Sequence, residues 1–387
     1  MTNLQNPFLQ GLNKFLFGAS LTVLVGSALL SCGNNANDTT ATGDSTTNIS
    51  DTSSSAAKLS PKGEDPAWGP TIKDEMLVVI EKLKSYGAPP LETLTPAEAR
   101  KQPTPTTAVM DVMKEANIPM PASMVDTTGQ EIPVSGGSIH ARIYTPRTGA
   151  GPFPVIVYYH GGGWVIADLD TYDGSARALA EGVGAVVVSV HYRQGPEHKF
   201  PTAHNDAFAA YQWVLKNAAS IKADPKMIAV AGESAGGNLA ANVSIMARDK
   251  GVTIPLHQLL VYPVANNDMA SESYQKYGTA MPLSKPLIEW MVKNYLPSPA
   301  ASADPRIALV KANLKGLPPT TIVAAEIDLL QTEGKLLAEK LKDAGVDVDY
   351  KMYDGVTHEF FGMATVVPEA KEAQAYATGR LKTAFNK

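Results

Sequence analysis

Residues 232–236 read GESAG, and they lie between an apolar segment, Met227–Ala231, and a helical segment, Gly237–Asp249. A G-x-S-x-G turn requires this strand–turn–helix context, because small neighbours let the backbone turn sharply and present the hydroxyl of Ser234. The start of the following helix also offers free N–H groups to negative charge. The motif occurs by chance elsewhere, but its position here predicts a nucleophilic serine.

A second glycine-rich turn, HGGGW at residues 160–164, follows another apolar segment, Val155–Tyr159. Because glycine has no Cβ, such a loop can turn its amides inward and lie close to a ligand. An enzyme that attacks an acyl group must stabilise an oxyanion, and prearranged N–H donors do so. A flexible hinge or a phosphate loop is the other reading, but the Gly-Lys-Ser/Thr of phosphate loops is missing from the sequence. The two turns together predict one acyl-transfer site.

Short apolar segments alternate with helical segments through most of the chain. The expected strands are Ile139–Tyr144, Val155–Tyr159, Ala185–Val190, Met227–Ala231, Gln258–Tyr262, Thr321–Ala325 and Asp347–Tyr353. Helices are expected at Ala203–Lys216, Gly237–Asp249 and Gly334–Ala344, among others. Strands that alternate with helices, and that are apolar on both faces, predict an α/β fold with a mainly parallel central sheet flanked by helices.

Two further segments are expected to form a helical cap. Residues 67–125 contain an amphipathic helix at Asp74–Tyr86 and a capping box, Thr95-Pro96-Ala97-Glu98, that opens a second helix. Residues 126–387 form the expected catalytic domain, interrupted at about 269–299 by a polar and then aromatic insertion that adds to the cap.

The N-terminal region has the composition of a secretory leader and a tether. Residues 1–31 combine Lys14 with an apolar core and small residues, which is typical of a signal peptide. The segment Leu29-Leu30-Ser31-Cys32 resembles the lipobox of bacterial lipoproteins, whose cysteine is lipidated and becomes the mature N-terminus. Residues 32–66 are mostly small and polar, so they predict a flexible tether. We therefore expect a lipid-anchored protein of the bacterial cell envelope, with an uncleaved membrane helix as the other reading.

Composition limits the function further. Of the 387 residues, 44% are hydrophobic and 18% charged, the balance of a globular protein, and the net charge is −5. Nucleic acid is therefore not an expected partner, because phosphate contacts need concentrated positive charge. The seven histidines and the single cysteine show no metal-ligand spacing, so no metal and no cofactor is expected.

Three motifs taken together resemble the hormone-sensitive lipase family of α/β-hydrolases, in its bacterial carboxylesterase form. They are HGGGW (160–164), YRQGPEHKFP (192–201) and GESAGG (232–237), and the likeness extends from about residue 67 to the C-terminus. The resemblance implies an α/β-hydrolase fold and an oxyanion hole formed by the amides of Gly162, Gly163 and Ala235.

The resemblance also implies the partners of Ser234. The acid and the base follow the serine in chain order, each after a strand, and the matching positions are Asp328 and His358. The chain departs from the family beyond Asp328, where Leu329-Leu330 replaces proline and arginine. It departs again after the histidine, where Glu359 replaces a glycine.

Two other carboxylates remain open as alternatives. Glu326 could replace Asp328 as the acid, and Asp354 could orient His358, although a turn-forming role suits Asp354 better.

The predicted function is hydrolysis of short- to medium-chain carboxylic esters through an acyl-enzyme, with a small-molecule ester as the substrate. A deacetylase or lactonase with the same triad is a rival prediction, because substrate choice depends on the cap and the pocket. A ligand-binding protein on the same scaffold is a second rival. The natural substrate, the oligomeric state and the membrane face that carries the anchor stay open.

Overall fold

Eight strands form one sheet in the order β1-β2-β4-β3-β5-β6-β7-β8 in the computed structural model, which describes residues 59–387. The strands are β1 (Val125–Val134), β2 (Gly137–Pro146), β3 (Phe153–Tyr159), β4 (Val186–His191), β5 (Ala223–Glu233), β6 (Gln258–Val261), β7 (Thr320–Ile327) and β8 (Val348–Thr357). Strands β4, β3, β5, β6, β7 and β8 pair in parallel, whereas β2 pairs antiparallel with β1 and β4. The predicted α/β fold with a mainly parallel sheet is confirmed.

Ten α-helices surround or cap this sheet within the described residues. They are α1 (Asp74–Ser85), α2 (Pro96–Ala99), α3 (Pro105–Glu115), α4 (Asp173–Val183), α5 (Thr202–Asn217), α6 (Ala235–Asp249), α7 (Glu272–Tyr277), α8 (Lys285–Tyr295), α9 (Gln331–Asp343) and α10 (Pro368–Ala384). Short 3₁₀ helices lie at Leu91–Thr93, Ala218–Ile221, Pro299–Ala303, Leu309–Lys311 and Phe360–Gly362. None of the helices in residues 59–387 is both long and apolar enough to cross a bilayer.

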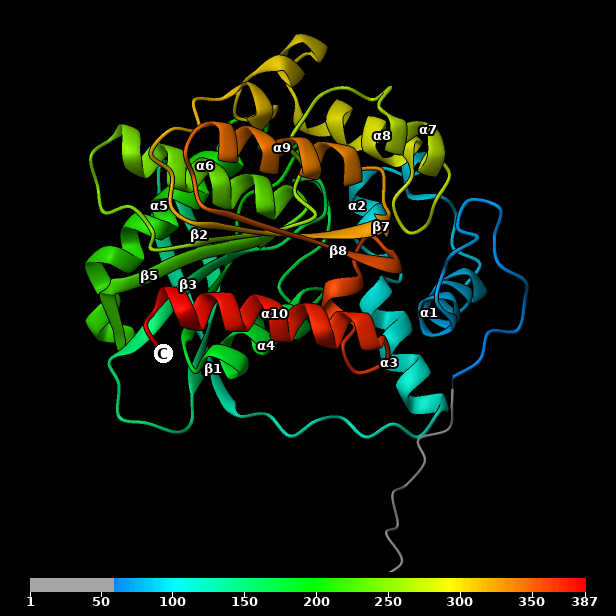
Figure 1. Cartoon of the computed structure of the whole chain (residues 1–387), viewed down its shortest axis with the longest axis horizontal. Helices are drawn as coiled ribbons and strands as arrows, with labels where there is room; N and C mark the ends of the chain where they lie inside the picture. Colours follow the sequence, from blue (N-terminus) through cyan, green and yellow to red (C-terminus); the bar gives the residue numbers. More distant parts are fainter. Residues whose placement is uncertain (1–58) are drawn as a thin grey trace, which may run out of the picture. The chain divides into compact units, whose positions relative to one another are not determined.

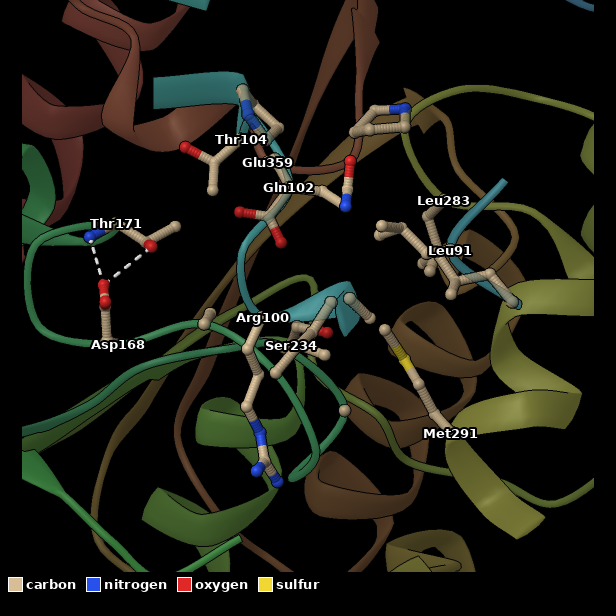
Figure 2. Close-up of a pocket in the computed structure, with 18 of the residues that line it drawn as sticks. Leu91, Arg100, Gln102, Thr104, Asp168, Thr171, Ser234, Leu283, Met291 and Glu359 are labelled. Carbon is tan, nitrogen blue, oxygen red and sulfur yellow. Dashed lines mark hydrogen bonds between the residues drawn. The ribbon is translucent and has the colours of Figure 1, made fainter. Parts of the chain in front are cut away.

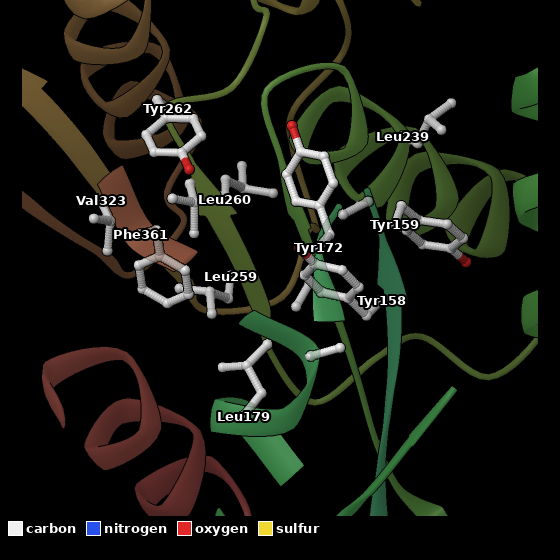
Figure 3. Close-up of a cluster of buried hydrophobic side chains, with 14 of the residues drawn as sticks. Tyr158, Tyr159, Tyr172, Leu179, Leu239, Leu259, Leu260, Tyr262, Val323 and Phe361 are labelled. Carbon is white, nitrogen blue, oxygen red and sulfur yellow. The ribbon is translucent and has the colours of Figure 1, made fainter. Parts of the chain in front are cut away.

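Helices cover both faces of the sheet (Figure 1), so its central strands are buried on both sides. Helices α6 and α9 lie on one face, and α4 and α10 lie on the other. All seven residues of β3 are buried, as a strand between two helical layers requires. In the core, Leu259, Leu260 and Val323 of neighbouring strands pack near Leu179 of α4 and Phe361 (Figure 3).

Helix α10, which covers the sheet, was not among the helices named from the sequence, and small residues form most of its buried face. The buried positions of α10 are Ala370, Ala373, Ala377, Thr378 and Leu381. Alanine-rich faces allow close packing of α10 against α4, but they give a weak hydrophobic period in the sequence.

The cap elements come from two segments. Helices α1 to α3 precede β1, and α7 and α8 lie in the insertion after β6. Figure 1 shows these helices near the end of the sheet where β7 and β8 terminate. The predicted capping box is present, because the Glu98 amide donates to Thr95 Oγ1 at 3.3 Å and the Thr95 amide donates to Glu98 Oε2 at 3.0 Å.

The predicted signal peptide, Cys32 and most of the tether lie outside the described residues, so they stay predictions from the sequence. The predicted tether extends to residue 66, but its last residues already contact the cap in the structure. The amides of Lys62 and Gly63 donate to the carboxylate of Glu81 on α1. This carboxylate attracts the polar segment to the cap, which composition alone does not reveal.

Candidate active site

Ser234 lies at a sharp turn between β5 and α6, where its backbone has φ +56° and ψ −119°. This conformation is costly for a residue with a side chain and persists only where the surroundings enforce it. The two flanking glycines make the turn possible. A Cβ on Gly232 would lie 2.2 Å from the carbonyl oxygen of Gly236, and a Cβ on Gly236 would lie 2.0 Å from that of Tyr159.

Hydrogen bonds to the neighbouring strand and helix fix this turn. The Ser234 amide donates to the carbonyl of Val261 at 2.9 Å, at the end of β6. The Ser234 carbonyl in turn accepts from the amides of Asn238 and Val264, each at 3.1 Å. These backbone hydrogen bonds, made by both the amide and the carbonyl of Ser234, hold its hydroxyl at the carboxyl edge of the sheet.

The glycine loop after β3 also needs residues without side chains. Gly162 and Gly163 have φ values of +92° and +60°, in the left-handed region that favours glycine. A Cβ at Gly162 would lie 2.2 Å from the carbonyl oxygen of Ile166, and one at Gly163 would lie 2.2 Å from Sδ of Met291. The loop is thus packed between Ile166, which follows it in the chain, and Met291 of helix α8.

Three backbone amides near Ser234 have no acceptor in the described part of the chain. They belong to Gly162, Gly163 and Ala235, the residues expected to form an oxyanion hole. Ala235 is the first residue of α6, so its N–H lies at the positive end of the helix dipole. Unpaired donors of this kind can bind an oxyanion, because no protein acceptor competes for them.

His358 follows β8 and is hydrogen-bonded to Asp328, which follows β7. The two atoms, His358 Nδ1 and Asp328 Oδ2, are 2.7 Å apart, and both side chains are buried. The amide of Leu330 donates to the other oxygen of Asp328 at 3.0 Å and fixes the carboxylate. Because a carboxylate accepts, Nδ1 carries the proton, and Nε2 is left with a free lone pair.

His358 differs electrostatically from the other buried histidines. Burial lowers its pKa, but the charge and hydrogen bond of Asp328, with help from Glu359, outweigh burial and raise the pKa above its ordinary value. Burial instead lowers the pKa of His160 to about 3 and those of His204 and His257 to about 4. These three histidines are therefore neutral at pH 7, whereas Asp328 favours the protonated form of His358.

Neither of the two alternative carboxylates is hydrogen-bonded to His358 among the described residues. Glu326 accepts hydrogen bonds from Thr71 Oγ1 at 2.9 Å and from the amide of Gly355 at 2.7 Å. Asp354 is an exposed residue of β8 rather than of a turn. The structure therefore pairs His358 with Asp328, and Glu326 helps to hold the start of the cap against β8.

Ser234 and His358 line the same cavity, which has a volume of about 310 Å³ and is also lined by Gly162 and Gly163 (Figure 2). Among the described residues, no hydrogen bond joins the Ser234 hydroxyl to His358. Bonds between a nucleophile and its base are often long before substrate binds and shorten in the Michaelis complex. The site thus brings the predicted serine, base, acid and amides to one sheet edge.

A buried group beside the serine was not singled out in the sequence. Glu233 accepts from Tyr158 at 2.5 Å and also from the hydroxyl of Tyr262. Burial and the charge of Glu359 raise the pKa of Glu233 to about 7. The ring centroids of Tyr262 and His358 are 4.4 Å apart, so Glu233 holds a tyrosine ring that packs against the imidazole. Glu233 is the first x of the G-x-S-x-G motif. A carboxyl group directly before the predicted nucleophile was the sequence feature that could have drawn attention to it.

Comparisons with known proteins agree with this geometry. A family model described as the α/β-hydrolase fold matches residues 156–362. The carboxylesterase NlhH of Mycobacterium tuberculosis is 41% identical over 252 residues, which cover 64% of this chain and 79% of that protein. The ethyl acetate hydrolase of Pseudomonas putida is 32% identical over 301 residues, which cover 76% of this chain and 93% of that protein.

Solved structures give the same result. A thermostable esterase from Pseudomonas putida superposes with a TM-score of 0.74 at 34% identity, covering 82% of this chain and 98% of that one. EstE1, a thermophilic carboxylesterase from a metagenomic library, superposes with a TM-score of 0.69 at 38% identity, covering 76% of this chain and 98% of that one. The chain therefore belongs to the α/β-hydrolase family, in its hormone-sensitive lipase group.

Proposed function

We propose that this protein is a serine carboxylesterase that hydrolyses esters of short acyl groups through an acyl-enzyme. The observation that carries this proposal is one cavity lined both by Ser234, on its strained turn, and by His358, whose Nδ1 is hydrogen-bonded to Asp328. The relatives support the reaction class, because they include proteins named as a carboxylesterase and an ethyl acetate hydrolase.

The first half of the reaction acylates Ser234. Its Oγ forms a bond to the ester carbonyl carbon, its proton moves to Nε2 of His358, and the carbonyl π electrons move to the oxygen. The amides of Gly162, Gly163 and Ala235 stabilise this oxyanion, and Asp328 stabilises the imidazolium. The bond to the leaving oxygen then breaks as His358 returns the proton to it, which releases the alcohol.

The second half repeats these steps with water. His358 takes a proton from water, whose oxygen attacks the acyl carbon, and the same amides bind the second oxyanion. Collapse releases the carboxylic acid and returns the proton to Ser234. The ester and one water molecule balance the two halves.

Two cavities adjoin Ser234, and they differ in size and in lining. The larger has a volume of about 310 Å³ and is lined by His358. The smaller has a volume of about 50 Å³ and an apolar lining that includes Ile288, Val292 and Leu296. His358 must protonate the leaving alcohol, so the alcohol occupies the larger cavity and the acyl group the smaller. A cavity of this size accepts an acyl chain of a few carbons.

Two further proposals, a deacetylase activity and a lipid anchor, are supported by fewer observations. A deacetylase is a special case of the same chemistry, since an acetyl group fits the smaller cavity. Lipid attachment at Cys32 and a position in the bacterial cell envelope rest on the sequence of residues 1–66 alone.

Replacing the nucleophile tests the reaction. Ser234→Ala should lower kcat on a nitrophenyl acetate by a factor on the order of 10⁶, because the acyl-enzyme cannot form. The matched control is Ser244→Ala, a buried serine of the same helix that hydrogen-bonds to the carbonyl of Ala240. The control should keep its activity and its covalent labelling by a fluorophosphonate. A Ser234→Ala enzyme that is as active as the parent would refute the proposal, and an unlabelled parent would favour a binding protein.

The pH dependence tests the role of Asp328. His358 must be neutral to act as a base, so kcat/KM should fall at pH values below the raised pKa of His358. Asp328→Asn removes the charge that raises this pKa, so the acidic limb should move to lower pH. The plateau should fall on the order of 10⁴-fold, the loss known for this change in another triad. Asp354→Asn is the control and should change neither quantity, whereas an unmoved limb in Asp328→Asn would contradict the assignment.

Two adjacent residues of α8 test the assignment of the cavities. Ile288 lines the smaller cavity and Leu287 lines the larger. Ile288→Ala removes three side-chain carbons from the wall, so the optimal nitrophenyl ester should lengthen by about two carbons. Leu287→Ala should leave the acyl optimum unchanged. The measurement is kcat/KM on nitrophenyl esters from acetate to palmitate. If the optimal acyl length changes in Leu287→Ala but not in Ile288→Ala, the assignment of the two cavities is reversed.

A further inference from the structure

Glu359 occupies a position that favours glycine. Its φ is +73°, in the left-handed region where a side chain is unfavourable. It directly follows His358, at the place where the family resemblance expects glycine. Strain of this kind clusters at functional sites, so the carboxylate that it positions is a candidate for a role in the cavity.

The carboxylate of Glu359 lies beside the reacting groups. Its Oε1 accepts a hydrogen bond from the hydroxyl of Tyr172 at 2.6 Å and lies 4.0 Å from Nε2 of His358. Its other oxygen has no hydrogen-bond donor in the described part of the chain. The side chain keeps 20% of its surface exposed and points into the larger cavity (Figure 2). Glu359 therefore presents free acceptor positions to whatever fills this cavity.

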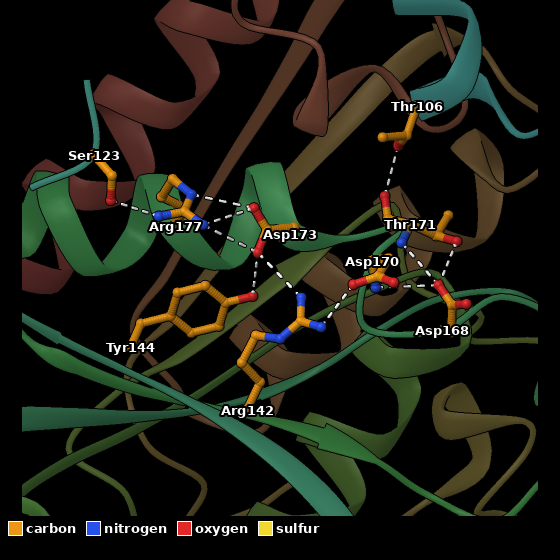
Figure 4. Close-up of polar contacts among 9 residues, drawn as sticks. All are labelled: Thr106, Ser123, Arg142, Tyr144, Asp168, Asp170, Thr171, Asp173 and Arg177. Carbon is orange, nitrogen blue, oxygen red and sulfur yellow. Dashed lines mark hydrogen bonds and ion pairs between the residues drawn. The ribbon is translucent and has the colours of Figure 1, made fainter. Parts of the chain in front are cut away.

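Tyr172 is held firmly enough to fix the carboxylate. Its hydroxyl lies so close to Gly161 that a Cβ there would be 2.2 Å away. Hydrogen bonds hold the chain on either side of Tyr172 (Figure 4). Asp168 accepts from the amide and hydroxyl of Thr171, and Asp173 accepts from Arg177. Glu359 thus hydrogen-bonds to a rigid donor and has little freedom to turn away.

The other charged side chains of the larger cavity do not neutralise Glu359. Arg100 lines the cavity, but its guanidinium donates to Glu197 and to the carbonyls of Val165 and Gly195. Figure 2 shows this guanidinium directed away from Glu359. Asp168, which also lines the cavity, adds a second negative charge. Of the described residues that line the cavity, Arg100 is thus paired elsewhere, and burial lowers the pKa of the remaining basic group besides His358, the imidazole of His191.

The lining of the larger cavity is divided. Polar side chains of Gln102, Thr104 and Thr171 lie on the side of Glu359, and Leu91, Leu283 and Met291 form the opposite side (Figure 2). A purely apolar alcohol would fill this space but would leave the second carboxylate oxygen of Glu359 desolvated and without a donor, which is costly. An alcohol that carries its own hydrogen-bond donor avoids this cost.

We propose that Glu359 is a specificity-determining residue that accepts a hydrogen bond from a second hydroxyl on the alcohol part of the ester. This inference rests on the proposed function, because it places the leaving oxygen at Nε2 of His358. A hydroxyl on the second carbon from the leaving oxygen then reaches the carboxylate of Glu359, whose Oε1 lies 4.0 Å from Nε2. The preferred substrates are short-chain monoesters of diols and polyols.

Two acetates that differ in one group test this proposal. In 2-hydroxyethyl acetate and propyl acetate, a hydroxyl replaces a methyl group of similar size. The quantity to measure is the ratio of their kcat/KM values at pH 8, for the parent, Glu359→Gly and Glu359→Gln. We expect the ratio to fall by at least about tenfold in Glu359→Gly, the lower end of what a hydrogen bond to a charged group contributes, and by less in Glu359→Gln, which keeps an acceptor. Glycine suits the backbone at this position, so the variant should fold.

The design separates specificity from damage to the base. An effect of Glu359 on His358 alone would change both rates equally and leave the ratio constant, and that result would overturn the inference. Glu372→Gln, an exposed carboxylate of α10, is the control and should keep the parent's ratio. A parent enzyme that hydrolyses neither acetate would overturn the proposed function and this inference with it.

Discussion

The backbone turn at Ser234 is the constraint on which the rest of the site depends. A residue with a side chain is held at φ +56° because Gly232 and Gly236 lie in contact with backbone carbonyls and leave no room for a Cβ. The turn aims one hydroxyl at the sheet edge and places the first amide of α6 beside it. Because β5 lies between β3 and β6 in the sheet, the glycine loop after β3 reaches this point from a neighbouring strand.

Charge in the site is arranged around one imidazole. Asp328 lies at Nδ1, Glu359 lies near Nε2, and Glu233 fixes the tyrosine ring that packs on the same histidine. Each of these carboxyls is buried or partly buried. The hydroxyls of Tyr158 and Tyr262 donate to Glu233 and that of Tyr172 to Glu359, whereas Asp328 accepts from His358 and the Leu330 amide. An imidazolium that forms during the reaction therefore meets preorganised negative charge, whereas the other buried histidines stay neutral.

Much of the fold could be predicted because its strands are apolar and short, and because glycine turns have a strict steric meaning. The pairing of Asp328 with His358 was implied by the family resemblance, in which the acid and the base follow the serine in chain order, each after a strand. The contact of Glu233 with Tyr262 could not be predicted, since it joins two strands through side chains that carry no motif. The two cavities were equally hidden, because they depend on how α8 packs, with Leu287 on one side and Ile288 on the other. Glu359 was visible as a departure from the family, but its direction and its contact with Tyr172 needed coordinates.

The central claim is that the Ser234 hydroxyl and the amides of Gly162, Gly163 and Ala235 act on one carbonyl group. A crystal structure of the enzyme after reaction with a phosphonate ester tests it most directly, since the tetrahedral adduct imitates the intermediate. The account predicts a covalent bond from phosphorus to Ser234 Oγ and a phosphoryl oxygen about 2.7–3.1 Å from those amide nitrogens. An adduct on another residue, or a phosphoryl oxygen that points away from the three amides, would contradict it.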